Sequence, residues 1–185
     1  SLTSSLGLTG LALAAMLAWN TDFSFLYADI AGSGLLPVEA ENQGKVVVTT
    51  ELGGGEGIPA RVHRIAQQGL TNVLRHLGVM RGAVQTRADM GQPPTLLTQA
   101  LNREDYLLAP ESGVFEVCVD LGAPVRSGDV VGCIHNLERP DRRPEAIVAQ
   151  SSGYLITMRV PCLTQQGDCV AVIAKEVRIE EVLAA

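Results

Sequence analysis

The sequence is poor in aromatic residues and in positive charge. Only 4% of its 185 residues are aromatic, and 14 lysines and arginines face 20 aspartates and glutamates, which gives a formal net charge of −6. No basic residue precedes Lys45. Nucleic-acid binders present a basic face, and single-strand binders stack bases on aromatic rings. We therefore expect no nucleic-acid partner.

Several motifs of metal and nucleophile chemistry are also missing. The sequence contains no Cys-x-x-Cys pair, no His-Glu-x-x-His and no Gly-x-Ser-x-Gly. A zinc ribbon, a zincin helix and a nucleophile elbow therefore have no support. The four cysteines are expected to be reduced, mostly buried thiols of a cytoplasmic protein; they are Cys118, Cys133, Cys162 and Cys169.

An apolar run near the start of the sequence is too short to span a membrane. It covers residues 6–19, and no positive residue precedes it as in a signal peptide. We expect a buried helix there and no membrane partner. With 46% hydrophobic residues, the chain has enough apolar surface to form a substantial core, which excludes intrinsic disorder.

The first 82 residues have the patterns of a layered α/β domain. They predict a helix, two strands and a second helix, at residues 3–19, 23–28, 45–50 and 62–77. Asn20 and Gly78 are placed to end the two helices, and Pro59 suits the first turn of the second. Residues 51–57 between them form a glycine-rich loop.

The second half of the sequence changes character. Residues 83–108 are predicted to be a connecting segment with strands, and residues 109–185 a β-sandwich domain with an internal repeat. Gly113 and Gly153 are forty residues apart, and the pairs Gly128-Asp129 and Gly167-Asp168 are thirty-nine apart. Each Gly-Asp pair is predicted to be a turn that leads into a strand.

Glu51 is the most informative polar residue. It follows a run of β-branched residues and precedes three glycines. A carboxylate at such a strand end can approach a substrate closely and act as a general base or acid. Alternatively, it caps the next helix or faces water. The glycine run Gly55-x-Gly57-x-x-Ala60 is a weak dinucleotide pattern, because no acidic residue lies near position 75–80 to hold a ribose.

The histidines form no chelating pair. His63 and His76 are thirteen residues apart on one predicted helix and are expected to lie at its surface or half-buried. His135 lies at a strand end, where it is either a turn residue or reaches a neighbouring site, so its role stays open. The polar segment at residues 138–145 predicts a solvated hairpin loop, whose arginines could bind a carboxylate.

Residues 44–57, GKVVVTTELGGGEG, and the helix that ends RIAQQGLTNVLRHLGVM (residues 64–80) resemble the succinylglutamate desuccinylase/aspartoacylase family of zinc-dependent amidohydrolases. Within that family, they are most similar to the branch that deacetylates N-acetyl-diaminobutyrate. The segments SGVFEVCVDLGAPVRSGDVVGCI and GDCVAVIA are similar to its C-terminal β domain. The resemblance covers nearly the whole chain.

The resemblance implies a fold and a chemistry. The fold is α/β plus all-β: the C-terminal piece of a zinc-carboxypeptidase-like α/β domain (residues 1–82), followed by a barrel-sandwich-like β domain. The complete enzyme holds one Zn²⁺ through a His-x-x-Glu pair and a later histidine. It hydrolyses a small N-acyl amino acid, and the residue that matches the family's general base is Glu51.

This chain departs from the family pattern in two ways. Glu56 replaces the fourth glycine of the loop, which adds a second carboxylate whose role stays open. The zinc ligands are expected upstream of Ser1, so no zinc is expected on this chain and the fragment alone is expected to be inactive. The alternative is a non-catalytic binding or assembly module derived from such an enzyme. Exposed strand edges would make homo-oligomers possible.

Overall fold

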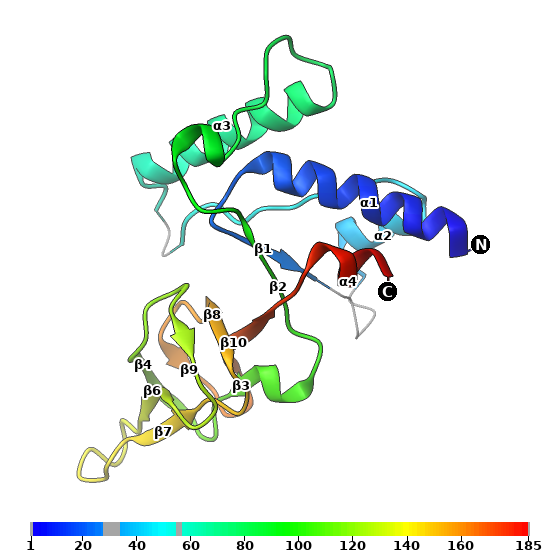
Figure 1. Cartoon of the computed structure of the whole chain (residues 1–185). Coiled ribbons are helices and arrows are strands. Elements are labelled where there is room, and N and C mark those ends of the chain that lie inside the picture. Colours follow the sequence, from blue (N-terminus) through cyan, green and yellow to red (C-terminus); the bar gives the residue numbers. More distant parts are fainter. Residues whose placement is uncertain (1, 28–33, 55–56, 185) are drawn as a thin grey trace. The chain divides into compact units, whose positions relative to one another are not determined.

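The chain forms two compact units in the computed structural model, which describes residues 2–27, 34–54 and 57–184 (Figure 1). Unit 1 is drawn from residues 1–24, 28–97 and 178–185, and unit 2 from residues 25–27 and 98–177. The fold is mixed α/β with two sheets.

Unit 1 is mainly helical. Its elements are α1 (Leu2–Trp19), α2 (Leu36–Asn42), α3 (Ala60–His76), the 3₁₀ turn η1 (Ala88–Met90) and α4 (Ile179–Ala184). The two predicted helices, at residues 3–19 and 62–77, are confirmed as α1 and α3. In the described ranges, no helix has both the length and the apolar character needed to cross a lipid bilayer.

The helices α1 and α3 pack directly on each other. A Cβ atom on Gly69 of α3 would lie 2.5 Å from the indole ring of Trp19. Glycine is therefore required there for the close approach of the two helices. On α1, Leu13, Ala15 and Ala18 are buried, but Leu11 is 59% exposed and the other described side chains are half-buried. The helix therefore contributes to a core, but it is not buried on all sides as expected.

Both long helices end as the sequence predicts. Asn20 follows α1 with a left-handed φ of 72°, and Gly78 follows α3 with φ 71°. At the end of α3, the Gly78 N–H donates to the Arg75 carbonyl at 3.0 Å and the Val79 N–H to the Leu74 carbonyl at 2.9 Å. This pair of bonds is a Schellman motif, which satisfies two of the last carbonyls of the helix.

The prediction of a strand at residues 45–50 is wrong. These residues are described, but they belong to no strand and join no ladder. They are exposed except for the half-buried Val47. The β-branched run favours an extended backbone, but a strand also requires hydrogen-bonded neighbours, and the described part of the chain supplies none here.

Two strands, β1 (Phe23–Leu26) and β2 (Leu96–Gln99), are divided between the two units. The other strands lie in unit 2. They are β3 (Tyr106–Leu108), β4 (Gly113–Val117), β5 (Pro124–Val125), β6 (Val130–His135), β7 (Glu145–Val148), β8 (Gly153–Met158), β9 (Leu163–Thr164) and β10 (Cys169–Glu176). The 3₁₀ turn η2 (Arg103–Asp105) precedes β3. The strand predicted at residues 23–28 is confirmed as β1; residue 28 lies outside the described residues.

The strands form two sheets. One has the order β1-β2-β10-β8-β5, with β3 also paired to β10, and the other has the order β7-β6-β4-β9. The pairings among β2 to β10 are all antiparallel, for example Glu116 of β4 opposite Cys133 of β6. Side chains from both sheets form one core; those with 0% exposure in it are Val131, Ile134, Leu155, Val170 and Ile173.

The two halves of unit 2 make matching contacts. A Cβ on Gly113 would lie 2.3 Å from the His135 carbonyl oxygen, and one on Gly153 would lie 2.3 Å from that of Ala174. Backbone hydrogen bonds also join the two halves in matching pairs. Phe115 N–H donates to Cys162 O and Leu155 N–H to Ala123 O; Gly128 N–H donates to Ala149 O and Gly167 N–H to Ala109 O. Each half therefore completes the hydrogen bonding of the other.

The predicted Gly-Asp turns are present. Gly128 and Gly167 have positive φ values of 97° and 89°. Asp129 accepts the backbone N–H of Arg126 at 2.8 Å, and Asp168 accepts that of Gln165, also at 2.8 Å. Glycine is needed for the left-handed backbone, and aspartate closes each turn.

The expectation that the cysteines are mostly buried is wrong. All four are free thiols, but Cys118, Cys162 and Cys169 are exposed and Cys133 is half-buried. The inward positions of their strands belong to larger or branched residues such as Ile134 and Val170. The cysteines therefore occupy the outward or terminal positions.

Candidate functional site

Glu51 lies in unit 1 between the extended segment at residues 45–50 and the glycine loop. It is exposed, and it has no hydrogen bond or ion pair with any described residue. The structure therefore gives Glu51 no capping role toward α3 within the described residues. Its carboxylate is open to an approaching molecule, as a general base requires.

The glycine loop beside Glu51 turns tightly. Gly53 has φ 90°, and a Cβ there would lie 2.7 Å from the carbonyl oxygen of Gly57. Gly54 and Gly57 form an isolated β-bridge, closed by the Gly57 N–H at 3.3 Å from the Gly54 carbonyl. A side chain is thus excluded at Gly53, whereas Gly54 and Gly57 have open space around them. Glu56, the second carboxylate of the sequence analysis, lies outside the described residues.

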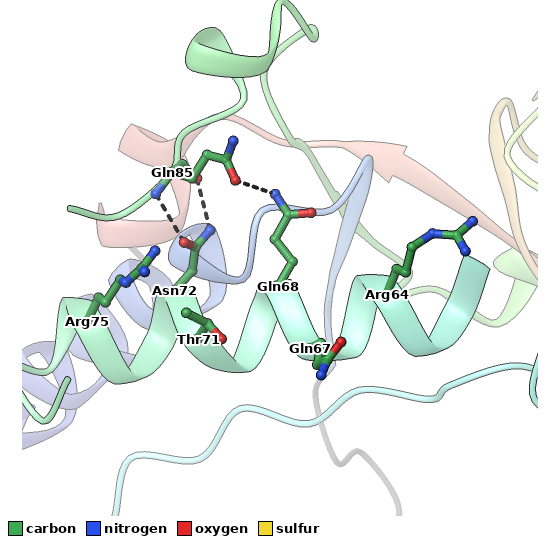
Figure 2. A pocket seen from close by; sticks show the side chains of 7 residues that line it. All are labelled: Arg64, Gln67, Gln68, Thr71, Asn72, Arg75 and Gln85. Atoms are coloured by element: carbon green, nitrogen blue, oxygen red, sulfur yellow. Dashed lines mark hydrogen bonds between the residues drawn. The ribbon is translucent and has the colours of Figure 1, made fainter. Parts of the chain in front are cut away.

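A polar hollow lies along one face of α3, and none of the candidate catalytic residues lines it (Figure 2). Its volume is about 320 Å³, and its lining residues are Arg64, Gln67, Gln68, Thr71, Asn72, Arg75 and Gln85. Asn72 anchors one wall: its side-chain amide donates to the Gln85 carbonyl at 2.9 Å and accepts the Gln85 N–H at 3.0 Å. Gln68 donates to the Gln85 side chain at 2.8 Å.

The lining of this hollow includes two arginines and no acidic side chain. No aspartate or glutamate occurs between residues 57 and 88, although the chain as a whole is acidic. Arg64 and Arg75 have no carboxylate partner among the described residues; Arg75 donates to the Ala83 carbonyl at 3.3 Å. Guanidinium groups without partners bind carboxylates and other anions. The absence of acidic residues over residues 57–88 is a sequence signal for arginines without carboxylate partners, although it does not indicate the hollow itself.

The histidines are spread over both units. His63 and His76 are exposed on α3, as expected. In unit 2, Nε2 of His135 lies 2.5 Å from Oε2 of Glu116 on the neighbouring strand. This pairing ties His135 to the outer face of the four-stranded sheet.

One His-x-x-Glu sequence does occur in the chain, at His135 and Glu138. Sequence reasoning missed it when it placed the whole pattern upstream of Ser1. It follows Glu51 in the chain, whereas the family pattern implies zinc ligands that precede the general base. The side-chain oxygen of Asn136 accepts the Glu138 N–H at 3.0 Å, which makes this segment a tight turn.

The described residues do not form a zinc site. No three of their histidines, cysteines, aspartates and glutamates are grouped so that they could hold a metal ion. His135, Glu116 and Glu138 are included in that statement. The donor set needed for a catalytic zinc, three side chains around one point, is thus not met by the part of the chain that the structure describes.

Two of the three arginines in the 138–145 hairpin are paired within the chain. Arg139 contacts Asp141 at 3.1 Å, and Arg142 contacts Glu111 at 2.9 Å and Glu145 at 3.5 Å. The hydrogen bond with Asp141 raises the pKa of Arg139. These contacts fix the hairpin and leave Arg139 and Arg142 unsuited to hold a free carboxylate.

The known proteins that resemble this chain align with nearly all of it, but this chain spans only about half of their length. No protein-family model matches it. The N-alpha-acetyl-L-2,4-diaminobutyric acid deacetylase of Halomonas elongata is 29% identical over 160 residues, which are 86% of this chain and 46% of the deacetylase. The product-bound ectoine utilization protein EutE (DoeB) of Ruegeria pomeroyi has a TM-score of 0.82 and 35% identity, over 91% of this chain and 50% of that one.

Two further solved structures agree. A succinylglutamate desuccinylase of Silicibacter sp. TM1040 is 36% identical with a TM-score of 0.79, and a succinylglutamatedesuccinylase/aspartoacylase of Rhodobacter sphaeroides is 29% identical with a TM-score of 0.82. Each alignment includes 92% of this chain and 50% of the relative. The resemblance inferred from residues 44–80 is confirmed, and the matched part of these relatives is their C-terminal portion.

Proposed function

We propose, on the premise that this chain is a relative of the C-terminal portion of the succinylglutamate desuccinylase/aspartoacylase family, that it is part of an enzyme that hydrolyses the amide bond of an N-acyl amino acid. The relatives are named as deacetylases and desuccinylases. Because the chain spans about half their length, the activity is proposed for the complete polypeptide. A cytoplasmic location, favoured by four unpaired thiols, is part of the proposal.

The observation that carries this proposal is the position of Glu51. Glu51 lies within residues 44–57, which carry the family resemblance. Its carboxylate is exposed, has no partner among the described residues, and is followed at Gly53 by a position where an added Cβ would clash. It does not cap α3 within the described residues, and it faces water. This exposure makes the carboxylate available to a reacting molecule, and the match of Glu51 to the family's general base suggests its role.

Glu51 acts as the general base in the proposed reaction. Its carboxylate takes a proton from water as the water oxygen bonds to the amide carbonyl carbon. The same proton is then passed to the nitrogen of the leaving amine when the C–N bond breaks. The products are a carboxylic acid and a free amine.

Zinc dependence is proposed for the complete enzyme, with ligands upstream of Ser1. The described residues of this chain do not supply the set of ligands that a zinc ion needs. The β domain is proposed to be barrel-sandwich-like, which the matched bonds between its two halves support.

The test compares Glu51→Gln with Glu41→Gln in the protein expressed from the complete reading frame, assayed on N-acetyl-diaminobutyrate. Both residues are exposed carboxylates of unit 1. We expect Glu51→Gln to lower kcat by about 100-fold or more, since general-base catalysis contributes on that order, and Glu41→Gln to leave it unchanged. Normal turnover of Glu51→Gln would remove Glu51 from the mechanism.

A second candidate function, an anion-binding module without catalysis, is favoured by the hollow on α3. Its lining combines Arg64 and Arg75 with amides and no acid. Titration of this chain with an N-acyl amino acid, followed by NMR, would support it if α3 amides shift and Arg75→Ala abolishes the shift. Binding that survives Arg75→Ala would exclude this hollow as the site.

A further inference from the structure

Two of the four cysteines lie next to each other on the outer face of the four-stranded sheet. Glu116 of β4 is opposite Cys133 of β6, and the Cys118 N–H donates to the Val131 carbonyl at 2.8 Å. Cys118 and Cys133 therefore occupy diagonal positions on neighbouring antiparallel strands, which brings their side chains to the same face. The Cys118 thiol is hydrogen-bonded to that of Cys133. The fold thus brings together two thiols that residues 119–132 separate in the sequence.

The other two cysteines lie elsewhere in unit 2. Cys162 adjoins β9, which pairs with β4 on the edge opposite to β6. The strand β4 therefore lies between Cys162 and Cys133. Cys169 begins β10, which belongs to the other sheet. The contact between Cys118 and Cys133 is thus particular to this pair, and the other two thiols serve as internal controls.

The two thiols of the pair differ in how easily they react. Cys118 is exposed, whereas Cys133 is half-buried. Burial raises the pKa of the Cys133 thiol, and so do the neighbouring Cys118 thiol and the Glu116 carboxylate. The thiolate is the attacking form of a cysteine. Cys118 is therefore suited to react first with an incoming molecule, and Cys133 is suited to react afterwards with Cys118.

We propose that Cys118 and Cys133 form a reversible disulfide in the folded chain, by exchange with a small disulfide such as oxidised glutathione. The Cys118 sulfur loses its proton and attacks one sulfur of the small disulfide, whose S–S bond breaks and releases one thiolate. The Cys133 thiolate then attacks the Cys118 sulfur of this mixed disulfide and releases the second small thiolate. The protein thiols lose two electrons and two protons, and the small disulfide becomes two thiols.

This bond makes unit 2 responsive to the redox state of its surroundings. Disulfides of cytosolic proteins are usually transient, and exposed ones are the more easily reduced. The bond closes the loop of residues 119–132, which carries β5 and its buried Val125. Closing a loop restricts the unfolded chain and so favours the folded state. The bond involves only residues of unit 2, and it does not depend on the activity proposed above.

The experiment equilibrates this chain with mixtures of reduced and oxidised glutathione, blocks the remaining thiols with an alkylating agent, and identifies joined peptides by mass spectrometry. We expect a monomer that is lighter by two hydrogen atoms, with the peptides of Cys118 and Cys133 joined. The same equilibration in concentrated urea measures the pair in the unfolded chain. We expect the equilibrium constant for the disulfide to be about 10-fold or more larger in the folded chain, because the fold holds the thiols in contact. An equal or smaller constant in the folded chain would overturn the proposal.

Two serine variants provide the matched control. Cys118→Ser removes the thiol that reacts first, and Cys162→Ser removes an exposed thiol outside the pair. We expect Cys118→Ser to lose the internal disulfide and Cys162→Ser to keep it. Amide NMR signals of β4 and β6 show whether each variant is folded, and Cys133→Ala removes the pair in a second way if Cys118→Ser does not fold.

Three other products would contradict the proposal. The first is a joined peptide that contains Cys162 or Cys169 in the folded chain. The second is a disulfide-linked dimer without the internal bond. The third is a mixed disulfide with glutathione that persists at Cys118, which would mean that Cys133 does not reach it.

Discussion

Both units leave some apolar side chains exposed, but unit 2 buries several large apolar side chains completely, whereas none of the described large apolar side chains of unit 1 is completely buried. In unit 2, Leu155 and Ile173 have no exposed surface. In unit 1, Leu36, Ile58 and Val79 are 82%, 75% and 73% exposed, although these residues are as apolar as those of unit 2. Apolar composition alone therefore does not produce a core; the neighbours that cover the side chains must be present.

The difference follows from how each unit completes its hydrogen bonding. In unit 2, the two halves exchange backbone bonds, such as Phe115 with Cys162 and Leu155 with Ala123. The strands β3 to β10 thus find their partners within unit 2, and β1 and β2 extend one of its sheets. In unit 1, residues 45–50 pair with no other described segment.

The largest expected effect is that of Leu155→Ala in unit 2. The side chain is fully buried, so we expect a loss of about 2–5 kcal/mol in the free energy of unfolding of this unit. Leu70→Ala on α3, where the side chain is 54% exposed, should change stability by less than about 0.5 kcal/mol. NMR signals of β8–β10 report on unit 2 during urea unfolding, and Trp19 fluorescence reports on unit 1.

The sequence contains a single tryptophan, Trp19, so its fluorescence isolates unit 1. If Leu155→Ala shifted the Trp19 transition as much as the NMR transition, the two units would unfold together. That result would contradict the contrast between the two units, because the stability of unit 1 would then depend on the core of unit 2.

Replacing either repeat glycine should cost less than losing a core leucine. Gly113→Ala and Gly153→Ala each place a Cβ 2.3 Å from a backbone carbonyl, so we expect about 1–3 kcal/mol of destabilisation from each. Gly54→Ala in unit 1 is the matched control, since nothing lies within 4 Å of its added carbon. Strongly unequal effects of Gly113→Ala and Gly153→Ala, measured by urea unfolding, would disprove equivalent roles for the two repeats.

Asp105 gives the stability of unit 2 a dependence on acid. Burial pushes the pKa of Asp105 up, but the Asn102 N–H, the Ser151 hydroxyl and the Lys175 ammonium together leave it below its usual value. Oδ2 accepts the Asn102 N–H at 3.0 Å, and Oδ1 lies 3.6 Å from Nζ of Lys175. The ionised carboxylate therefore stabilises the folded state.

Because the folded pKa is lowered, the stabilisation by Asp105 is complete above the unfolded pKa of about 3.9. It is lost as the pH falls through the folded pKa. We expect Asp105→Asn to cost about 1–3 kcal/mol at pH 7 and to flatten the fall in unit 2 stability below pH 4. A variant with unchanged acid dependence in urea unfolding between pH 2 and 7 would assign that dependence to other groups.

Sequence reasoning succeeded where the signal is local. The apolar spacing of α3, its terminal Gly78 and the two Gly-Asp turns are set by residues a few positions apart, and all are present. It failed for residues 45–50, because a strand depends on neighbours that a run of valines does not encode. The hollow on α3 was also missed, since the Asn72–Gln85 contact joins residues whose proximity no local pattern indicates.

The smallest expected effect is that of Glu51→Gln on stability. Glu51 is exposed and has no described partner, and exposed substitutions usually change stability by less than about 0.5 kcal/mol. We therefore expect the urea transition of Trp19 fluorescence to be unchanged, in contrast to the effect of Asp105→Asn on unit 2. A loss of 1 kcal/mol or more would mean that Glu51 stabilises unit 1. Glu51→Gln could then no longer separate an effect on catalysis from an effect on folding. The contrast between the two units would also fail at Glu51, the residue on which the proposed function depends.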